Sequence, residues 1–268
     1  MLITEIIRQI DVFVGGIMDE FFWGVESPGM IDWSTMPTYN TIMAVAAGAA
    51  LIALAMMLGD LRKSLEGKPF KADGYSMAFG ALGLILVTTG FHMTTTWPLA
   101  AGGFAYDNII FGETCLGFGA LLIFACFYLW KRRNDLMESQ DAYSDLLSTA
   151  KPLSIFAGGL GLGLWGISLA GVMYRLFTAP PQEPISGFFA TWPWFEAIFM
   201  SVFFFVIGLA CVLFPFGVFR ASNEANSEAK GGGLMALVMR LWMICGILIG
   251  LFGCLNFYTH IGLIVNTM

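Results

Sequence analysis

Charged residues are scarce in this chain: they make up 12% of its 268 residues, whereas hydrophobic residues make up 57%. An average soluble domain is about one quarter charged, so the chain has about half the charge that a water-exposed surface needs. The mean hydropathy is correspondingly high, at +0.76. The composition excludes an ordinary soluble domain and predicts an all-α, polytopic membrane protein.

Two further scarcities exclude other classes of protein. The five cysteines are odd in number and lie within long apolar runs, which excludes a disulfide-stabilised scaffold. Lysine and arginine total 13 against 19 acids, for a net charge of −6. Because binding to nucleic acid needs clustered basic residues, we expect no nucleic-acid partner.

Six segments are long and apolar enough to span a bilayer, for which a helix needs about 20 mostly apolar residues. They cover residues 39–59, 76–97, 113–130, 152–177, 194–219 and 234–265. Proline removes a backbone donor and stops a helix, so prolines such as Pro152 and Pro193 are expected to mark helix ends. Pro215 lies inside the fifth segment and predicts a kink or an early end there.

The first 38 residues form a separate segment, and the six-helix bundle occupies residues 39–268. Apolar residues recur at helical spacing from Ile3 to Phe22, but five charged residues interrupt them and forbid a membrane span. This pattern predicts an amphipathic, interfacial helix that lies on the membrane or on a partner subunit.

The basic residues predict the orientation of the chain. Eleven of the 13 lie in or beside the loops after the first, third and fifth segments, so by the positive-inside rule these loops are cytoplasmic and both termini are extracytoplasmic. The outer side then carries ten acids against two bases, Arg8 and Arg175. We expect a strongly acidic outer face in a cytoplasmic (inner) membrane.

The sequence also suggests an internal repeat. Residues 81–84 (ALGL) match residues 159–162 (GLGL), and each of these segments is followed by a proline, a Gly-Phe pair and a glutamate, Glu113 or Glu196, that opens the next segment. Two tandem helical hairpins of the same orientation would explain this pattern.

The only two histidines, His92 and His260, are both predicted to lie within the membrane. Each lies six residues before the outer end of its segment, which places both about 9 Å below the outer interface. Two imidazoles at equal depth can ligate a b-type haem from opposite sides, and Arg175 near the outer surface is positioned to bind the propionates. The alternative is structural: each imidazole hydrogen-bonds a neighbouring hydroxyl, amide or carbonyl.

Carboxylates add a second possibility for the histidines. Glu113 and Glu196 open segments on the same outer side, so His92, His260, Glu113 and Glu196 together form a candidate site for a Zn, Cu or Fe ion. The alternative for each glutamate is stabilisation of a helix N-terminus, where a negative charge is favourable.

The run of residues 90–113 carries a resemblance to a known family. A His-Met pair (His92, Met93) is followed by Trp97, Pro98 and Leu99, and then by Tyr106, Asn108, Ile109, Phe111 and Gly112, with Asp107 inserted after the tyrosine. This run resembles a motif of a family of uncharacterised polytopic membrane proteins of bacteria and archaea. The resemblance implies that the segment around His92 is a meaningful element, and it implies no activity.

These observations predict an integral subunit of a larger membrane complex that transfers electrons through a bis-His haem b near the outer leaflet. Its partners would be other membrane subunits, the lipid bilayer and a cationic soluble electron-transfer protein on the acidic outer face. One alternative is a cofactor-free scaffold subunit of a membrane complex. Another is a metal-dependent membrane enzyme that uses the histidines and glutamates.

Overall fold

The structure, a computed structural model, describes residues 14–97, 99, 104–223 and 232–268, and within these ranges it is helical and contains no strand. Six helices are long and apolar enough to cross a membrane, as predicted. They are α2 (Asn40–Ser64), α3 (Asp73–Thr95), α4 (Thr114–Glu138), α5 (Ala142–Met173), α6 (Pro193–Asn223) and α7 (Gly233–Thr267). Helices suit this composition because they satisfy every backbone hydrogen bond within one segment, without water.

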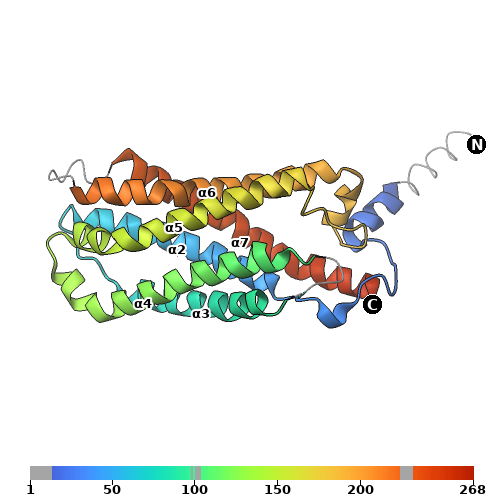
Figure 1. Cartoon of the computed structure of the whole chain (residues 1–268), viewed down its shortest axis with the longest axis horizontal. Helices are drawn as coiled ribbons and strands as arrows, with labels where there is room; N and C mark the ends of the chain where they lie inside the picture. The colour runs from blue at the N-terminus through green and yellow to red at the C-terminus, as the bar shows by residue number, and fades with distance from the viewer. Residues whose placement is uncertain (1–13, 98, 100–103, 224–231) are drawn as a thin grey trace, which may run out of the picture.

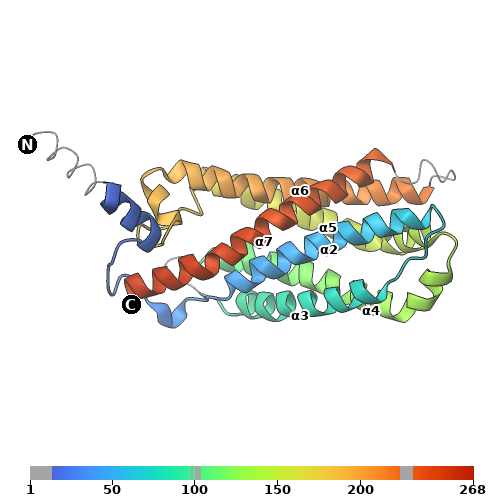
Figure 2. The same cartoon turned by 180° about the vertical axis from the view of Figure 1, so that it is seen from behind.

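The six helices pack as three close antiparallel pairs, α2 with α7, α3 with α4, and α5 with α6 (Figures 1 and 2). The α2–α7 pair joins the other two, since α2 contacts α3 and α7 contacts α6, whereas α4 and α5 pack against each other only loosely. Large apolar side chains such as Leu84, Phe127 and Leu251 are 60–64% exposed on the outer faces. Such an outer surface fits a multi-pass membrane protein surrounded by lipid.

The two ends of the bundle differ in charge. We call one end the terminal end, because residues 14–39 and the C-terminus lie there, and the opposite end the basic end (Figure 1). The basic end carries the described lysines and arginines of the three loops and their flanks: Arg62, Lys63, Lys68, Lys71, Lys131, Arg132, Arg133, Lys151, Arg220 and Arg240. The only base described at the terminal end is Arg175. The predicted separation of charge is present; which end is cytoplasmic stays a prediction.

The two predicted hairpins correspond to the α3–α4 and α5–α6 pairs. Gly83 and Gly161, which the repeat aligns, both lie where the two helices of a hairpin meet. A Cβ atom at Gly83 would lie 3.1 Å from the carbonyl oxygen of Gly119, and one at Gly161 would lie 2.7 Å from that of Gly208. The aligned glycines therefore have the same packing role, which is the close approach of two helix backbones.

Helix α5 begins ten residues before its predicted start, and the expectation that Pro152 marks a helix end was wrong. Asp141 caps the helix by accepting a hydrogen bond from the backbone N–H of Ser144 at 3.0 Å. Tyr143 and Leu147, in the first turns of the helix, are both buried. The hydrogen bond that Pro152 removes costs less than this capping and burial contribute. Pro215 does not end α6 early either, because the helix continues to Asn223.

A one-turn π-helix, η2 (Asn108–Glu113), precedes α4. Asn108 is 4% exposed, and its Nδ2 donates to the carbonyl oxygens of Met93 and, at 3.1 Å, Thr96. These carbonyls lie at the end of α3, where a helix leaves its last acceptors without partners. Asn108 therefore fixes the start of the α4 segment to the end of α3.

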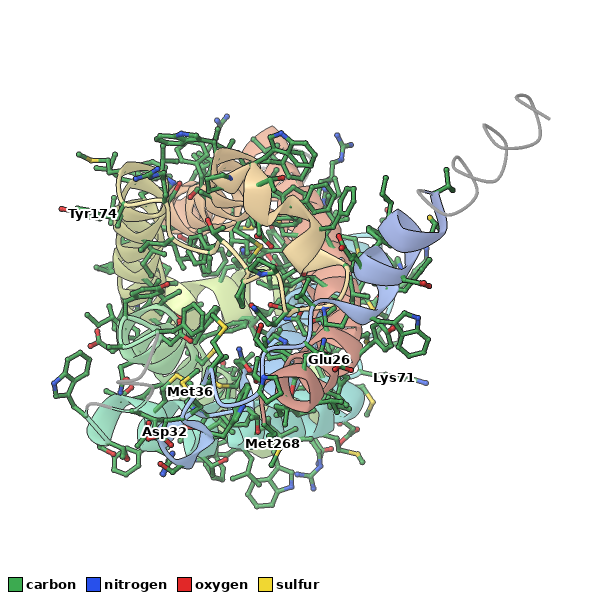
Figure 3. The ribbon with its side chains drawn as sticks, turned by 90° about the vertical axis from the view of Figure 1, so that its right-hand side faces the viewer. Glu26, Asp32, Met36, Lys71, Tyr174 and Met268 are labelled. Carbon is green, nitrogen blue, oxygen red and sulfur yellow. The ribbon has the colours of Figure 1, made fainter. Side chains whose placement is uncertain are left out.

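The described part of the N-terminal segment packs on the bundle of the same chain. Residues 14–23 are helical, whereas residues 1–13 of the predicted amphipathic helix lie outside the described residues. The carbonyl oxygen of Phe22 accepts a hydrogen bond from Tyr258 Oη at 2.5 Å, and that of Phe21 accepts one from the N–H of Ile185 at 2.6 Å. Residues 24–36, including Glu26, Asp32 and Met36, then cross the terminal end near Met268 (Figure 3).

Candidate functional site

His92 lies near the terminal end of α3 and is exposed. Its Nδ1 forms a hydrogen bond of 2.7 Å with Tyr39 Oη, and the two rings meet edge to face with centroids 5.7 Å apart. Tyr39 immediately precedes α2. The contact therefore joins α3 to the start of α2, as in the structural interpretation of the histidines.

His260, on α7, has polar partners at both ring nitrogens. Its Nε2 lies 3.1 Å from Nδ2 of Asn40, the first residue of α2. Its Nδ1 lies 3.3 Å from Thr259 Oγ1 and 3.5 Å from Glu183 Oε1. The side chains of His260 and Glu183 are 23% and 10% exposed. A proton on Nδ1 that faces the carboxylate leaves Nε2 free to accept a hydrogen bond from the Asn40 amide.

The two histidines thus bind consecutive residues, Tyr39 and Asn40, at the start of α2. This helix packs between α3 and α7, which carry His92 and His260. A ring nitrogen of each histidine already has a side-chain partner. Ligation of a haem b by this pair stays a prediction, which a reduced-minus-oxidised absorption spectrum of the purified protein would test.

The other predicted ligands each have their own surroundings. Glu113 is exposed at the end of η2, whereas Glu196 Oε2 accepts a hydrogen bond of 2.7 Å from the N–H of Ala179 and so fixes the connector between α5 and α6. Arg175 lies over the ring of Trp194, with its Cζ 5.7 Å from the ring centroid. Across the described ranges, no three His, Cys, Asp or Glu side chains are grouped as a metal site would need.

Two acids that sequence reasoning did not single out accompany His260 at the terminal end. Glu183, in the connector between α5 and α6, is 8% exposed. Asp107, just before η2, lies near enough for the charge of His260 to act on it, and burial raises the pKa of its carboxyl to about 7. Burial disfavours the charged form of this carboxyl, and the nearby His260 acts in the opposite direction. Asn40, His260, Glu183 and Asp107 therefore form a polar cluster contributed by α2, α7 and two connectors.

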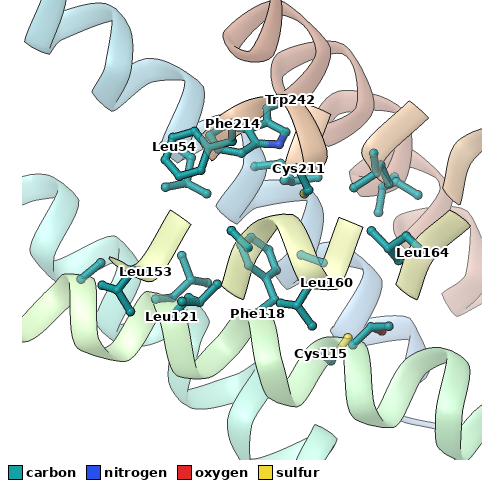
Figure 4. Close-up of a pocket in the computed structure, with 18 of the residues that line it drawn as sticks. Leu54, Cys115, Phe118, Leu121, Leu153, Leu160, Leu164, Cys211, Phe214 and Trp242 are labelled. Atoms are coloured by element: carbon teal, nitrogen blue, oxygen red, sulfur yellow. The ribbon is translucent and has the colours of Figure 1, made fainter. Parts of the chain in front are cut away.

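An apolar cavity of about 330 Å³ lies along the centre of the bundle, between α2, α4, α5, α6 and α7. Figure 4 shows Phe118 and Leu121 of α4 beside Leu153 and Leu160 of α5, with Phe214 and Trp242 on the opposite side. The lining on α5 extends from Leu146 to Leu164. At 1.5 Å per residue, 18 residues of helix correspond to a length of about 27 Å.

The cavity has polar lining residues at its terminal end. Asn40 lines it and connects it to the polar cluster through His260. Asn256, on α7, also lines it and is 7% exposed, and its side chain makes no hydrogen bond within the described ranges. Neither His92 nor His260 lines the cavity. The candidate site therefore consists of a long apolar cavity that ends at the amides of Asn40 and Asn256. The rest of the polar cluster lies behind Asn40.

A signal for part of this site exists in the sequence. An amide such as Asn256 inside an apolar run of 20 or more residues is costly in lipid and indicates a polar contact or a functional group. Asp107 and Glu183 carry no comparable signal, because acids are ordinary in exposed connectors. Their burial depends on how the connectors fold over the end of the bundle.

Comparison with known proteins identifies the family but no activity. No curated protein and no solved structure matches this chain. A family model described as "Protein of unknown function (DUF981)" matches residues 36–262, which include all six long helices except the last residues of α7. The chain therefore belongs to this family of proteins of unknown function.

Proposed function

We propose that this protein binds one long-chain amphiphile from the bilayer, with the chain of the ligand in the central cavity. The observation that carries the proposal is the shape and chemistry of the cavity. It is narrow, lined almost entirely by apolar side chains, and about 27 Å long, close to the thickness of about 30 Å of a bilayer hydrocarbon core. Its volume of about 330 Å³ is at the low end for ligand sites and favours one chain over two.

The loose contact between α4 and α5 supports entry of the ligand from the side. Phe124 on α4 and Leu153 on α5 both line the cavity, yet they are 65% and 44% exposed on the outer surface. Gly117 of α4 meets Leu160 of α5, where a Cβ atom would lie 3.0 Å from a leucine methyl group. Side chains that line the cavity and also face lipid mark a place where the ligand can pass from the bilayer into the cavity.

The energetics of such binding differ from those of a pocket in water. A chain that moves from lipid into an equally apolar cavity gains little from the hydrophobic effect, just as helices in lipid gain little from it when they associate. Affinity must then depend on close packing of the chain and on polar contacts of its head group. The proposed function requires both a chain-shaped cavity and a polar end.

Filling the cavity tests the proposal. Ala157 lines the cavity on α5, so Ala157→Phe places an aromatic ring inside it. Gly159, two residues on, has open space around a Cβ atom, so Gly159→Phe adds the same ring to the outer surface. We expect a photoreactive long-chain lipid, cross-linked in the membrane and mapped by peptide mass spectrometry, to label lining residues such as Leu121 and Leu153.

In this experiment, Ala157→Phe is expected to abolish labelling of the cavity lining, and Gly159→Phe is expected to preserve it. Labels restricted to the outer faces of the wild-type helices, or equal labelling of the lining in both variants, would contradict the proposed function. The predicted haem-dependent, scaffold and metal-dependent functions are separate hypotheses, and the spectrum and metal content of the same preparation test them.

A further inference from the structure

The terminal end of the cavity contains amide atoms without hydrogen-bond partners. Asn256 is 7% exposed, lines the cavity and has no hydrogen-bond partner within the described ranges. Asn40 also lines the cavity, and its Oδ1 is buried without a partner. An amide without a partner in an apolar environment costs about 1–3 kcal/mol, so the amide of Asn256 at one end of an apolar cavity indicates a polar group that the cavity is built to receive.

We infer, building on the proposed function, that the head group of the ligand lies at the terminal end of the cavity beside Asn40 and Asn256, and that it is uncharged and carries both a carbonyl and a hydroxyl oxygen. The Nδ2 of Asn256 donates to the carbonyl. The Oδ1 of the same side chain accepts from the hydroxyl. The hydrocarbon chain of the ligand extends from there toward the basic end.

Contacts with the polar cluster fix Asn40 at the polar end of the cavity. His260 holds the Nδ2 of Asn40 at 3.1 Å, and Glu183 lies 3.5 Å from the other ring nitrogen. A carboxylate at Nδ1 favours the tautomer with its proton there, so Nε2 accepts from the amide. Asn40 is thereby fixed beside the head group, and Asn256 is left as the amide that the ligand can reach.

The charges around the terminal end exclude an anionic head group. The ionisable groups described near the site are Asp107, Glu183, Glu196 and His260. The one described base of this end, Arg175, lies over Trp194. A phosphate there would have acids in its surroundings and no described lysine or arginine beside it, and burying a charge without a partner of opposite sign is costly.

The inference is tested with probes that share one chain and differ in the head group. 1-Oleoylglycerol carries an ester carbonyl and free hydroxyls, whereas 1-oleoyl lysophosphatidate adds a phosphate to the same molecule. We expect native mass spectrometry of the full chain in mild detergent to show one 1-oleoylglycerol per chain and at least tenfold weaker binding of the phosphate analogue.

Asn256→Leu removes the donor and keeps a side chain of similar size. It is expected to weaken 1-oleoylglycerol binding about tenfold, as the loss of one buried hydrogen bond predicts. The matched control is Asn134→Leu, which replaces an exposed amide on α4 at the basic end and is expected to leave the affinity unchanged.

Two results overturn the inference and leave the proposed function intact: equal binding of the phosphate analogue to the wild-type chain, or unchanged 1-oleoylglycerol binding in Asn256→Leu. The first of these needs no variant and so decides the question even where Asn256→Leu does not fold. Failure of every long-chain probe to bind the wild-type chain would instead overturn the proposed function, and the inference with it.

Discussion

Gly48→Ala is expected to lower the free energy of unfolding by about 1–3 kcal/mol, the usual cost of forcing an extra group into a close-packed contact. Gly48 lies in the contact between α2 and α7. A Cβ atom there would lie 2.5 Å from the backbone nitrogen of Gly250 and 2.7 Å from the carbonyl oxygen of Gly246. Because the opposing atoms belong to a helix backbone, they cannot move aside as a flexible side chain would, and the two helices must separate.

Gly250 provides the matched control on the opposite helix. A Cβ atom at Gly250 has nothing within 4 Å, so Gly250→Ala adds a methyl group to open space. Alanine is a better helix former than glycine by about 1 kcal/mol, and this variant is expected to be at least as stable as the wild type. Thermal unfolding of both variants in the same detergent measures the contrast. A destabilisation of similar size in both would contradict the close α2–α7 contact.

Asn266→Leu is expected to release the N-terminal segment from the terminal end and to lower the free energy of unfolding by about 2–4 kcal/mol. Asn266 is 8% exposed, and its Nδ2 donates to the carbonyl oxygens of Trp23 at 2.5 Å and Gln182 at 2.8 Å. Leucine cannot donate, so both carbonyls lose their partner. Asn266 thus joins residues 14–30 and the α5–α6 connector to the end of α7, in addition to the hydrogen bonds of Phe21 and Phe22 described above.

Limited proteolysis with chymotrypsin measures this release, because Phe21, Phe22 and Trp23 are cleavage sites in the affected segment. Faster cleavage there, with the remaining fragment intact, is the expected result. The control is Val265→Leu, which changes a neighbouring side chain that is 72% exposed. Cleavage rates equal to those of the wild type in Asn266→Leu would show that the segment is held by other contacts.

The sequence predicts the six long helices well because the physical signal is strong. Runs of about 20 apolar residues have few alternatives to a spanning helix, and the lysines and arginines divide the loops into two groups. The starts of helices are less certain. The rule that a proline ends a helix fails at Pro152, because the Asp141 cap and the burial of Tyr143 stabilise an earlier start. Both depend on residues outside the apolar run.

The candidate site is predicted only in part. Equal depth correctly places His92 and His260 toward the same end of the bundle, but depth says nothing about which direction each ring faces around its helix axis. That direction depends on how α2 packs between α3 and α7, and it gives the two rings different partners, Tyr39 and Asn40. The cavity depends on the loose contact between α4 and α5, which no local pattern encodes.

The polar cluster illustrates the same limit. Glu183 and Asp107 come from connectors that meet only after the hairpins have packed, and their burial follows from tertiary structure. The sequence does show that His260 and Asn256 are polar groups in an apolar segment. It does not show that His260 belongs to the polar cluster whereas Asn256 lines the cavity.

The central claim of this account is that the cavity holds one long-chain amphiphile. The most direct measurement is native mass spectrometry of the wild-type protein, solubilised from its own membrane in a mild detergent and released at low collision energy. We predict a major species with the mass of the chain plus one single-chain amphiphile, and loss of that species in Ala157→Phe. A wild-type chain found only at its bare mass, which also binds no added long-chain lipid, would contradict the account.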